Sequence, residues 1–456
     1  DWSKGGGWSI GGGVATANGN ANSNISQNIP LTVGNAYSVT YTVVNSSVGS
    51  RIGIAPQGTT IQIIRTADGT YTETFTAATS SFYIRSLWNN GSPVSVDNVS
   101  VKEWVGADMD VTRETDATRV DENGLIEKLG ANVPRIDYTG GGCPHILAEP
   151  QRTNLLPYSS DFSQWSEVSG ASVSSNSVVS PSGATDADTF TFDGTTYGRL
   201  EKTTAVTNGN TYSFSVYLKN NNLSDVTKVW LGFSQTGQGE FVTITNEWQR
   251  YETVQVANGS NEYPRVQFTG TGSLYAWGAQ LELGSYATSY IPTSGSTVTR
   301  NQDIFTRDGI GSLINSTEGV LFVEMASLAN DSTYKGISLS DGSTSNVVRF
   351  YTNPTENQFS IRVTVGGVHQ FNVVYTLTDL TAYNKVALKY KANDFAFWVN
   401  GIEVKTYLSG TTFTSNTLNK LALSNGSGSD YFFGKVKQLQ VYKTALTDVQ
   451  LEALTT

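Results

Sequence analysis

The sequence predicts an all-β protein of three β-sandwich (jelly-roll) domains joined by a strand-and-turn connector. Apolar and polar residues alternate along much of the chain, a two-residue period that is typical of half-buried strands. Hydrophobic residues make up only 38% of the chain, yet it holds 22 Tyr, 19 Phe and 9 Trp, which suits thin two-layer domains with large rings in their cores. The predicted divisions are residues 1–104, 105–149, 150–293 and 294–456.

Residues 1–104 read as the first sandwich. A turn at Gly34-Asn35 precedes strict alternation from Tyr37 to Val43, and Asp68-Gly69 predicts a hairpin turn. The segment 94–103 is the expected closing strand. A first strand is missing from the pattern, so we expect either a truncated N-terminus or completion by another chain; the start at Asp1 rather than Met fits a piece of a longer protein.

The connector, residues 105–149, is dense in charge and contains the only cysteine. Asn123-Gly124 lies between short apolar runs, which is the strongest local hairpin signal. Residues 133–138 are expected to be extended, and the prolines at 144 and 150 exclude a long helix. We therefore predict a rigid linker with a small sheet of its own.

Residues 150–293 repeat the plan of the first sandwich. The segments that align are 206–218 with 32–43, 248–254 with 69–75, and 274–282 with the closing strand. The linkers that follow also match, because Val111-Thr-Arg is echoed by Val298-Thr-Arg. Two copies of one supersecondary plan are predicted.

Residues 294–456 differ from both copies. Strands are expected at 318–326, 385–404 and 433–442, the second of these being two strands joined at 392–394. Thr447 and Gln450 form a capping box that predicts a short helix from Thr447 to Leu454.

Three stretches resemble known families. The run TRVDENGLIEK…ANVPRIDY…GGCPHILAEPQRTNLLPYS is similar to a segment that recurs in tailed-bacteriophage virion proteins. Both repeated copies resemble the jelly-roll carbohydrate-binding modules found beside xylanases and glucanases. The motifs FWVNG and GKVKQLQVYKTALT resemble the laminin-G/concanavalin-A-like lectin fold. These resemblances imply an extracellular or virion-surface protein whose partners are polysaccharide or cell-surface glycans and other virion proteins.

Charge and hydropathy exclude several classes of partner. The formal net charge is −10 and no block of Lys or Arg stands out, which argues against nucleic acid and anionic membrane surfaces. No apolar run is long enough to span a membrane, so no membrane insertion is expected. A single cysteine means no internal disulfide.

Sugar-binding candidates are aromatic rings in polar surroundings, since a ring face stacks on the apolar face of a pyranose. Trp88, followed by Asn89, is the first candidate, and Trp230 and Trp8 are the next. For Trp88, ordinary partial burial is an equal alternative. Four tryptophans in alternating apolar runs are expected to lie in the core instead: Trp165, Trp248, Trp277 and Trp398.

A structural calcium ion is the expected cofactor. The resemblance to the carbohydrate modules implies that Asp97, in the closing strand, ligates it, since carboxylates suit hard cations. The alternative, left open, is that Asp97 caps a turn beside Asn98. Trp277 takes the equivalent place in the second copy, so no ion is expected there.

No catalytic residues are predicted. The chain has only two histidines, and neither lies in a nucleophile motif. No spacing of carboxylates requires the facing pair that glycoside hydrolysis needs. Cys143-Pro144-His145 supplies too few ligands for a zinc site, so a buried thiol beside a buried imidazole is expected.

The function predicted from these features is a non-catalytic phage adhesin, a tail or head fibre or decoration protein that binds polysaccharide. The alternatives are a purely architectural decoration protein and a polysaccharide depolymerase. A homo-oligomer is expected. A trimer would suit a fibre, although no heptad repeat in the sequence indicates one.

Overall fold

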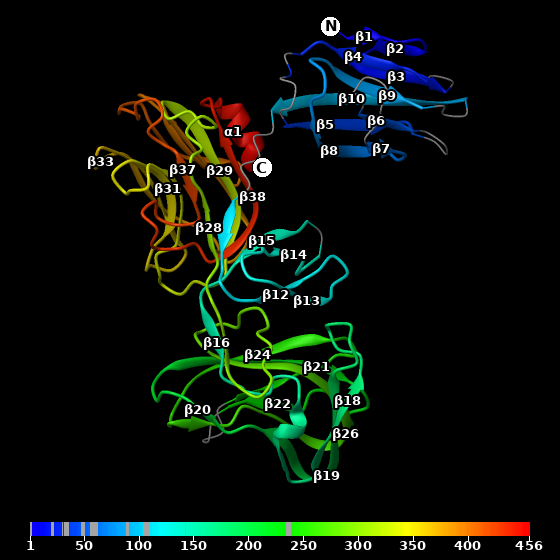
Figure 1. Cartoon of the computed structure of the whole chain (residues 1–456), viewed down its shortest axis with the longest axis vertical. Helices are drawn as coiled ribbons and strands as arrows, with labels where there is room; N and C mark the ends of the chain where they lie inside the picture. The colour runs from blue at the N-terminus through cyan, green and yellow to red at the C-terminus, as the bar shows by residue number, and fades with distance from the viewer. Residues whose placement is uncertain are drawn as a thin grey trace. The chain divides into compact units, whose positions relative to one another are not determined.

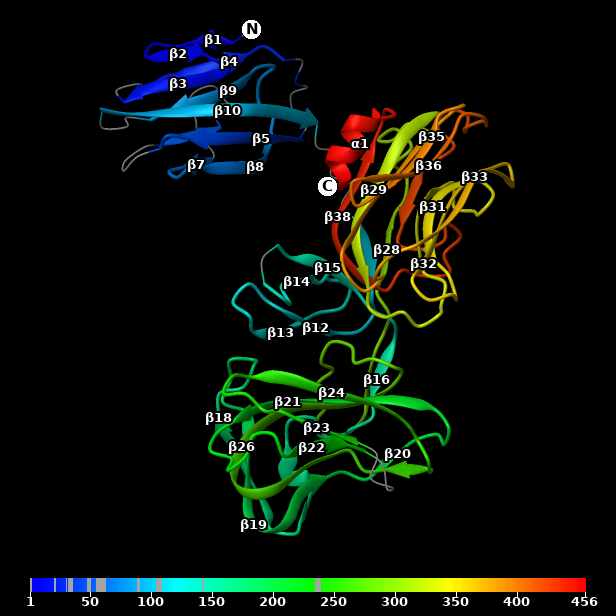
Figure 2. The same cartoon turned by 180° about the vertical axis from the view of Figure 1, so that it is seen from behind.

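The chain forms two compact units, residues 1–108 and 109–456, and both consist of β-sheets (Figure 1, and Figure 2 from behind). The helices of the described part are one α-helix and the short 3₁₀ turn η1 (Phe162–Gln164), so the all-β prediction is confirmed. None of the described helices is long and apolar enough to cross a membrane. The computed structural model describes residues 2–19, 22–29, 31, 36–46, 51–54, 63–87, 91–103, 109–141, 143–233 and 239–456.

The N-terminal unit is a sandwich of two five-stranded antiparallel sheets. The first sheet contains, in spatial order, β1 (Ser3–Lys4), β4 (Asn24–Gln27), β9 (Phe82–Ser86), β6 (Ile52–Ile54) and β7 (Ile63–Arg65). The second contains β2 (Trp8–Gly11), β3 (Val14–Gly19), β10 (Gly91–Glu103), β5 (Ala36–Val44) and β8 (Gly69–Thr76). The predicted alternation is visible in β5, where Tyr37, Val39, Tyr41 and Val43 are all buried.

The middle module, residues 152–300, contains a second copy of part of this plan. Its main sheet runs through β17 (Ser166–Val168), β19 (Ala187–Glu201), β26 (Arg265–Leu283), β21 (Thr211–Asn220) and β24 (Gln249–Val256). Beside that path, β18 (Ala171–Val178) pairs with β19, β22 (Val229–Gly232) joins β26 to β23 (Gly239–Val242), and β20 (Thr204–Ala205) pairs with β25 (Asn261–Glu262).

The order β26-β21-β24 matches β10-β5-β8 of the N-terminal unit, as the repeat predicted. The match holds to the residue, because Asp97 pairs with Thr42 and Trp277 pairs with Tyr217. A register shift follows each of these positions, where a residue of positive φ stands next to Asp97 or Trp277.

The long strands β19 and β26 each serve both layers of the middle module. Between their halves the register shifts from Asp193 to Tyr197, where the strands bend. Gly272 permits the bend: its φ is +123°, and a Cβ there would lie 2.4 Å from the carbonyl oxygen of Asn222. The first half of β26 therefore pairs with β22, and the second half with β21.

The C-terminal sandwich consists of two seven-stranded sheets. One contains β11 (Asp110–Thr112), β28 (Ile304–Arg307), β37 (Lys420–Ala422), β30 (Gly336–Ser340), β31 (Val347–Thr352), β32 (Gln358–Val365) and β33 (Val368–Thr376). The other contains β14 (Ile136–Asp137), β15 (His145–Ala148), β38 (Gly434–Tyr442), β29 (Glu318–Ser327), β34 (Asn384–Lys391), β35 (Phe395–Val399) and β36 (Ile402–Tyr407). The predicted capping box of Thr447 and Gln450 is present and begins helix α1 (Asp448–Thr455).

The connector differs from the predicted self-contained sheet. Its hairpin, β12 (Ala117–Val120) and β13 (Ile126–Leu129), forms as expected, with the Asp121 carboxylate accepting the backbone N–H groups of Asn123 and Leu125. However, β11 pairs with β28, and β15 pairs with β38. The connector strands are thus edge strands of the C-terminal sandwich, because an edge strand leaves N–H and C=O groups that a distant segment can satisfy.

It follows that the middle module is inserted within the C-terminal sandwich, between β15 and β28. The chain leaves through β16 (Arg152–Asn154) and returns through β27 (Val298–Arg300), which pair antiparallel with Asn154 opposite Val298. Figure 1 shows β16 between the middle module and the C-terminal sandwich.

A buried ion cluster lies at the base of the insertion. The Glu149 carboxylate is 2.5 Å from Arg135 Nη1 and 2.7 Å from Arg300 Nη1. The Asp303 carboxylate pairs with Arg135 and, at 2.8 Å, with Arg113. Burial acts to raise the pKa of Glu149, but the two arginines outweigh it and hold that pKa well below its usual range. Burying these charges costs desolvation free energy, which their mutual attraction offsets only when every charge is paired. The cluster therefore fixes one arrangement of β11, β15, β27 and the segment before β28.

Candidate functional site

An exposed sheet face of the middle module collects aromatic and charged side chains. The register places Arg199 of β19 opposite Gln267 of β26, Gln267 opposite Trp230 of β22, and Trp230 opposite Phe241 of β23. These four residues therefore lie in one row across four strands. The β22 face, as we call this surface, comprises Tyr197, Arg199, Glu201, Trp230, Phe241, Arg265 and Gln267.

The rings of the β22 face differ in exposure. Phe241 is 67% exposed and Tyr197 is 52% exposed, while Trp230 is only 9% exposed. The Arg265 guanidinium lies 4.7 Å from the centroid of the Trp230 ring. Gly239 packs against the same ring, since a Cβ at this position would lie 2.1 Å from Trp230 Cζ2. The β22 face thus has two exposed rings, Tyr197 and Phe241, and one nearly buried ring, Trp230.

The polar groups of the β22 face carry an excess of positive charge. Glu201 Oε2 is 2.7 Å from Arg199 Nε and 3.7 Å from Arg265 Nη1, so two guanidinium groups share one carboxylate. Burial, together with the neighbouring Arg199 charge, lowers the pKa of Arg265. Exposed rings beside guanidinium and carboxamide donors are the elements that bind a sugar: apolar stacking and directional hydrogen bonds.

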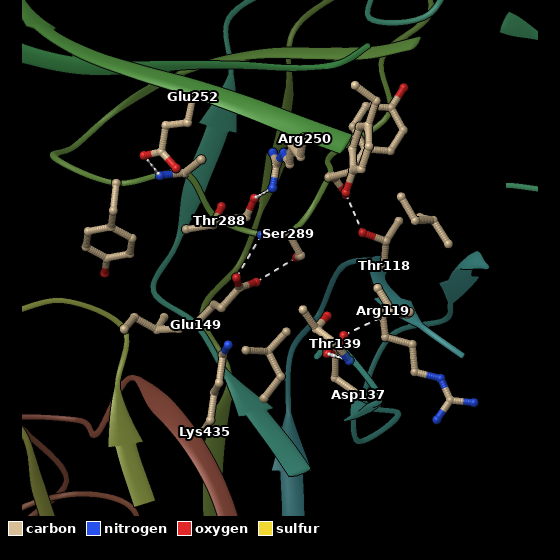
Figure 3. Close-up of a pocket in the computed structure, with 18 of the residues that line it drawn as sticks. Thr118, Arg119, Asp137, Thr139, Glu149, Arg250, Glu252, Thr288, Ser289 and Lys435 are labelled. Atoms are coloured by element: carbon tan, nitrogen blue, oxygen red, sulfur yellow. Dashed lines mark hydrogen bonds between the residues drawn. The ribbon is translucent and has the colours of Figure 1, made fainter. Parts of the chain in front are cut away.

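A separate, concave site lies where the middle module, the connector and the C-terminal sandwich meet (Figure 3). This junction cavity is partly enclosed and has a volume of about 520 Å³, within the range of small-molecule sites. Its lining includes Thr118, Arg119, Asp137, Glu149, Tyr217, Trp248, Arg250, Glu252, Tyr286, Thr288, Ser289, Tyr290 and Lys435.

Hydrogen bonds hold the walls of the junction cavity together. Thr118 Oγ1 of the hairpin donates to the Tyr290 carbonyl at 2.5 Å, and Glu149 accepts from the N–H and hydroxyl of Ser289 at 2.7 and 2.6 Å. The guanidinium of Arg250 donates to the Thr288 carbonyl at 2.5 Å. Figure 3 shows Lys435 extending from β38 toward the space beside Glu149.

The predicted sugar-binding residues fall in different places. Trp230 lies in the β22 face, beside exposed rings. Trp8 is 7% exposed, sits in the core of the N-terminal unit and donates its indole N–H to the Ser23 carbonyl at 3.1 Å, so it offers no free ring face. Trp88 and Asn89 lie outside the described residues.

The hydrogen bond made by Asp97 matches the alternative prediction, in which its carboxylate caps a turn beside Asn98. Its Oδ1 accepts the backbone N–H of Asn98 at 2.7 Å, and Asn98 has a φ of +51° at the register shift of β10. Within the described ranges, no group of three or more His, Cys, Asp or Glu side chains is placed to hold a metal ion. A lone carboxylate that already caps a bulge does not fit a calcium site of several oxygen ligands.

The Cys143 and His145 pair differs from expectation. Cys143 is exposed, so the predicted buried thiol is wrong, whereas His145 is buried in β15. The imidazole Nε2 is 3.5 Å from Asp137 Oδ1. Burial lowers the pKa of His145 to about 4, with Asp137 opposing the shift and Lys435 and Lys437 adding to it.

Sequence reasoning missed most aromatic residues of these two sites, including Trp248, Tyr197 and Phe241. Trp248 was expected in the core but is half-buried and lines the junction cavity. Its indole N–H donates to the Val179 carbonyl at 3.1 Å. Trp165, Trp277 and Trp398 are buried as predicted. Tyr197 lies in the long strand β19 and Phe241 in the short strand β23. For both, polar neighbours in the sequence are the only signal, and many other exposed positions share it.

Several solved structures show limited similarity to this chain. The CBM40 module of the Ruminococcus gnavus IT-sialidase bound to alpha2,3-sialyllactose is 16% identical, with 32% of this chain and 86% of that chain covered and a TM-score of 0.28. The CBM22-1–CBM22-2 tandem domain of Paenibacillus barcinonensis Xyn10C is 11% identical, with 61% of this chain and 94% of that chain covered and a TM-score of 0.23. The heptameric SAP-like pentraxin of Limulus polyphemus is 11% identical, with 31% of this chain and 71% of that chain covered and a TM-score of 0.24. With TM-scores below 0.5, these likenesses place no ligand or activity on this chain.

No curated protein matches the sequence at a significant level. Residues 321–452, from β29 to α1, match the family model described as the concanavalin A-like lectin/glucanases superfamily. The C-terminal sandwich is therefore a laminin-G/concanavalin-A-like domain.

Proposed function

We propose that this protein binds polysaccharide through the β22 face and carries out no chemistry on it. The observation that carries the proposal is the pair of exposed rings, Tyr197 and Phe241, in the same face as Trp230 and the Arg199–Glu201–Arg265 group. Ring faces exposed to solvent on a flat strand surface suit a polysaccharide that lies across the strands. A sugar ring can stack on an exposed aromatic ring without a pocket that encloses it.

The pairing of two carboxylates, one in each site, supports binding without hydrolysis. Glu201 is shared between two arginines, and Glu149 in the junction cavity is held ionised by Arg135 and Arg300. Neither is free to act as the general acid that cleavage of a glycosidic bond requires. We further propose that the protein acts at a phage virion surface as an attachment protein; the connector's likeness to virion proteins supports this step.

Affinity electrophoresis of the full chain in gels containing bacterial and algal polysaccharides tests the proposal. Phe241→Ala and Tyr197→Ala should each weaken binding roughly five- to tenfold, equivalent to about 1 kcal/mol or somewhat more, and the double variant should weaken it further. Tyr334→Ala, at another exposed ring, is the matched control and should leave binding unchanged.

Thermal unfolding of each variant should match the parent, because both rings are exposed. Retention by no polysaccharide, or equal retention of the parent and the double variant, would refute binding at this face. New reducing ends released from a retained polysaccharide would refute the absence of chemistry.

A further inference from the structure

The junction cavity contains two cations without a carboxylate partner. The Lys435 ammonium makes no hydrogen bond or ion pair with any of the described residues, although it extends into the cavity (Figure 3). Arg250 donates to the Thr288 carbonyl and, at 2.9 Å, to Ser215 Oγ, and no described carboxylate lies within ion-pair distance of it. The third cation, Arg119, is paired with Glu127 at 2.5 Å.

The acidic groups of the lining are already engaged. Asp137 accepts the backbone N–H groups of Val120 at 2.9 Å and Thr139 at 2.8 Å. Glu149 is paired with two arginines from outside the cavity. Glu252 accepts the N–H of Ala287 at 2.7 Å, and burial raises its pKa. Lys435 therefore differs from the other charged groups of the lining, each of which has a described hydrogen-bond or ion-pair partner.

Aromatic side chains form another part of the wall. Trp248 and Tyr286 are both half-buried, and the hydrogen bond from the Trp248 indole to Val179 fixes the plane of that ring. Tyr217 lies beneath Arg250, whose guanidinium carbon is 5.5 Å from the ring centroid. A rigid ring beside an unpaired cation can bind a ligand that carries both an apolar face and an anionic group.

We propose that the junction cavity is a second binding site, for one or two sugar units that carry a carboxylate. The carboxylate would pair with Lys435, and the C–H face of the pyranose would meet the aromatic wall. The volume of about 520 Å³ accommodates one or two sugar units and is too small for a longer polysaccharide segment. This site is separate from the β22 face and does not depend on it, so each can be present without the other.

Isothermal titration of the full chain with a panel of uronate disaccharides, based on glucuronate, galacturonate, mannuronate and guluronate, tests the proposal. Neutral disaccharides of glucose, galactose and mannose serve as matched ligands. At least one uronate should bind, at least tenfold more tightly than its neutral counterpart, and its affinity should fall as salt rises.

Lys435→Gln should lower the uronate affinity at least tenfold. Lys437→Gln is the matched control: it lies two residues along β38, its ammonium is 3.8 Å from the Tyr383 ring centroid, and it does not line the cavity, so it should change nothing. Phe241→Ala should also leave uronate binding unchanged. Binding by no uronate, equal binding of neutral sugars, or loss of binding in Phe241→Ala but not in Lys435→Gln would overturn the proposal.

Discussion

Arg113 and Arg300, the arginines of the two Val-Thr-Arg sequences, are buried in the same ion cluster. Arg113 Nη1 is 2.8 Å from Asp303 Oδ1, and Arg300 Nη1 is 2.7 Å from Glu149 Oε2. One arginine follows the strand that opens the C-terminal sandwich, and the other ends the strand by which the chain returns from the middle module. The repeated sequence thus supplies two of the three arginines of the cluster, and Arg135 of the connector is the third.

Neutralising Glu149 should destabilise residues 109–456 strongly. Glu149→Gln leaves Arg135 and Arg300 buried without a full complement of anions, which we expect to lower the free energy of unfolding by about 3–5 kcal/mol. Urea denaturation followed by tryptophan fluorescence measures this change. Glu127→Gln, which breaks a partly exposed pair with Arg119, should cost about 1 kcal/mol or less. Equal losses in the two variants would contradict the role assigned to the cluster.

Removing the middle module should leave a folded C-terminal sandwich. Because Asn154 lies opposite Val298, residues 109–154 can be joined to residues 298–456 by an Asn-Gly turn that closes β16 and β27 into a hairpin. We expect this protein to be soluble and to unfold cooperatively, although it loses the Ser289 hydrogen bonds to Glu149.

Residues 294–456 alone are the informative comparison. They lack β11 and β15, so β28 and β38 become open edges, and we expect aggregation or loss of cooperative unfolding. If residues 294–456 prove as stable and monomeric as the joined protein, by size-exclusion chromatography and thermal melts, the connector strands are not part of the sandwich.

Local signals in the sequence predicted local structure well. The Asn123-Gly124 turn and the Thr447–Gln450 cap are both present, because each depends on hydrogen bonds within a few residues. The equivalence of Asp97 and Trp277 also holds in the register. Pairing between β11 and β28 was not predicted, since no local pattern states which distant edge a short strand will join.

The same limit applies to the candidate sites. Trp248 and Trp277 both stand in alternating runs, yet Trp277 is buried against Tyr290 at a centroid distance of 4.5 Å and Trp248 borders the cavity. Both rings belong to one cluster, in which Trp277 is buried and Trp248 packs against it while partly buried. Alternation along the sequence does not indicate which of the two rings is covered. Lys435 carries no signal of its own, because an unpaired ammonium is visible only after all its neighbours are placed.

Gly239→Ala should weaken polysaccharide binding at the β22 face. The added Cβ would lie 2.1 Å from Trp230 Cζ2 and 2.6 Å from the Leu231 carbonyl oxygen, so the ring must move or β23 must separate from β22. We expect a loss of affinity of roughly fivefold or more and a fall in stability of about 1–3 kcal/mol. Affinity electrophoresis and intrinsic fluorescence measure the two effects. Unchanged binding and unchanged fluorescence would show that Trp230 tolerates the methyl group and that its packing against Gly239 is not required.

Helix α1 should contribute to the stability of the C-terminal sandwich through Leu451. This side chain is fully buried against Val320, Phe322 and Trp398, so Leu451→Ala should cost about 2–4 kcal/mol. Val449→Ala is the matched control on the same helix, where the side chain is 75% exposed, and should cost less than about 0.5 kcal/mol. Denaturant midpoints compare them, and similar midpoints for the two variants would contradict the packing of α1.

His145 should make stability depend on pH below about 6.5. Burial holds its pKa near 4 in the folded state, whereas in the unfolded chain it returns to the ordinary value of about 6.5. Between these values the unfolded state binds more protons, so the free energy of unfolding decreases as pH falls through this window. By pH 5 the contribution should amount to about 2 kcal/mol relative to pH 7.5.

His145→Gln removes this titration while keeping a polar side chain of similar size. Urea denaturation at pH 7.5, 6.5, 5.5 and 5.0 should therefore show a flatter dependence for this variant than for the parent. Asp137, at 3.5 Å, favours the protonated imidazole, and Lys435 and Lys437 oppose it. Lys435→Gln should therefore raise the folded-state pKa of His145, so that the loss of stability is smaller and ends at a higher pH. His369→Gln, at an exposed position, should follow the parent closely. Parallel curves for His145→Gln and the parent would mean that the buried imidazole is protonated as readily in the folded protein as in the unfolded chain.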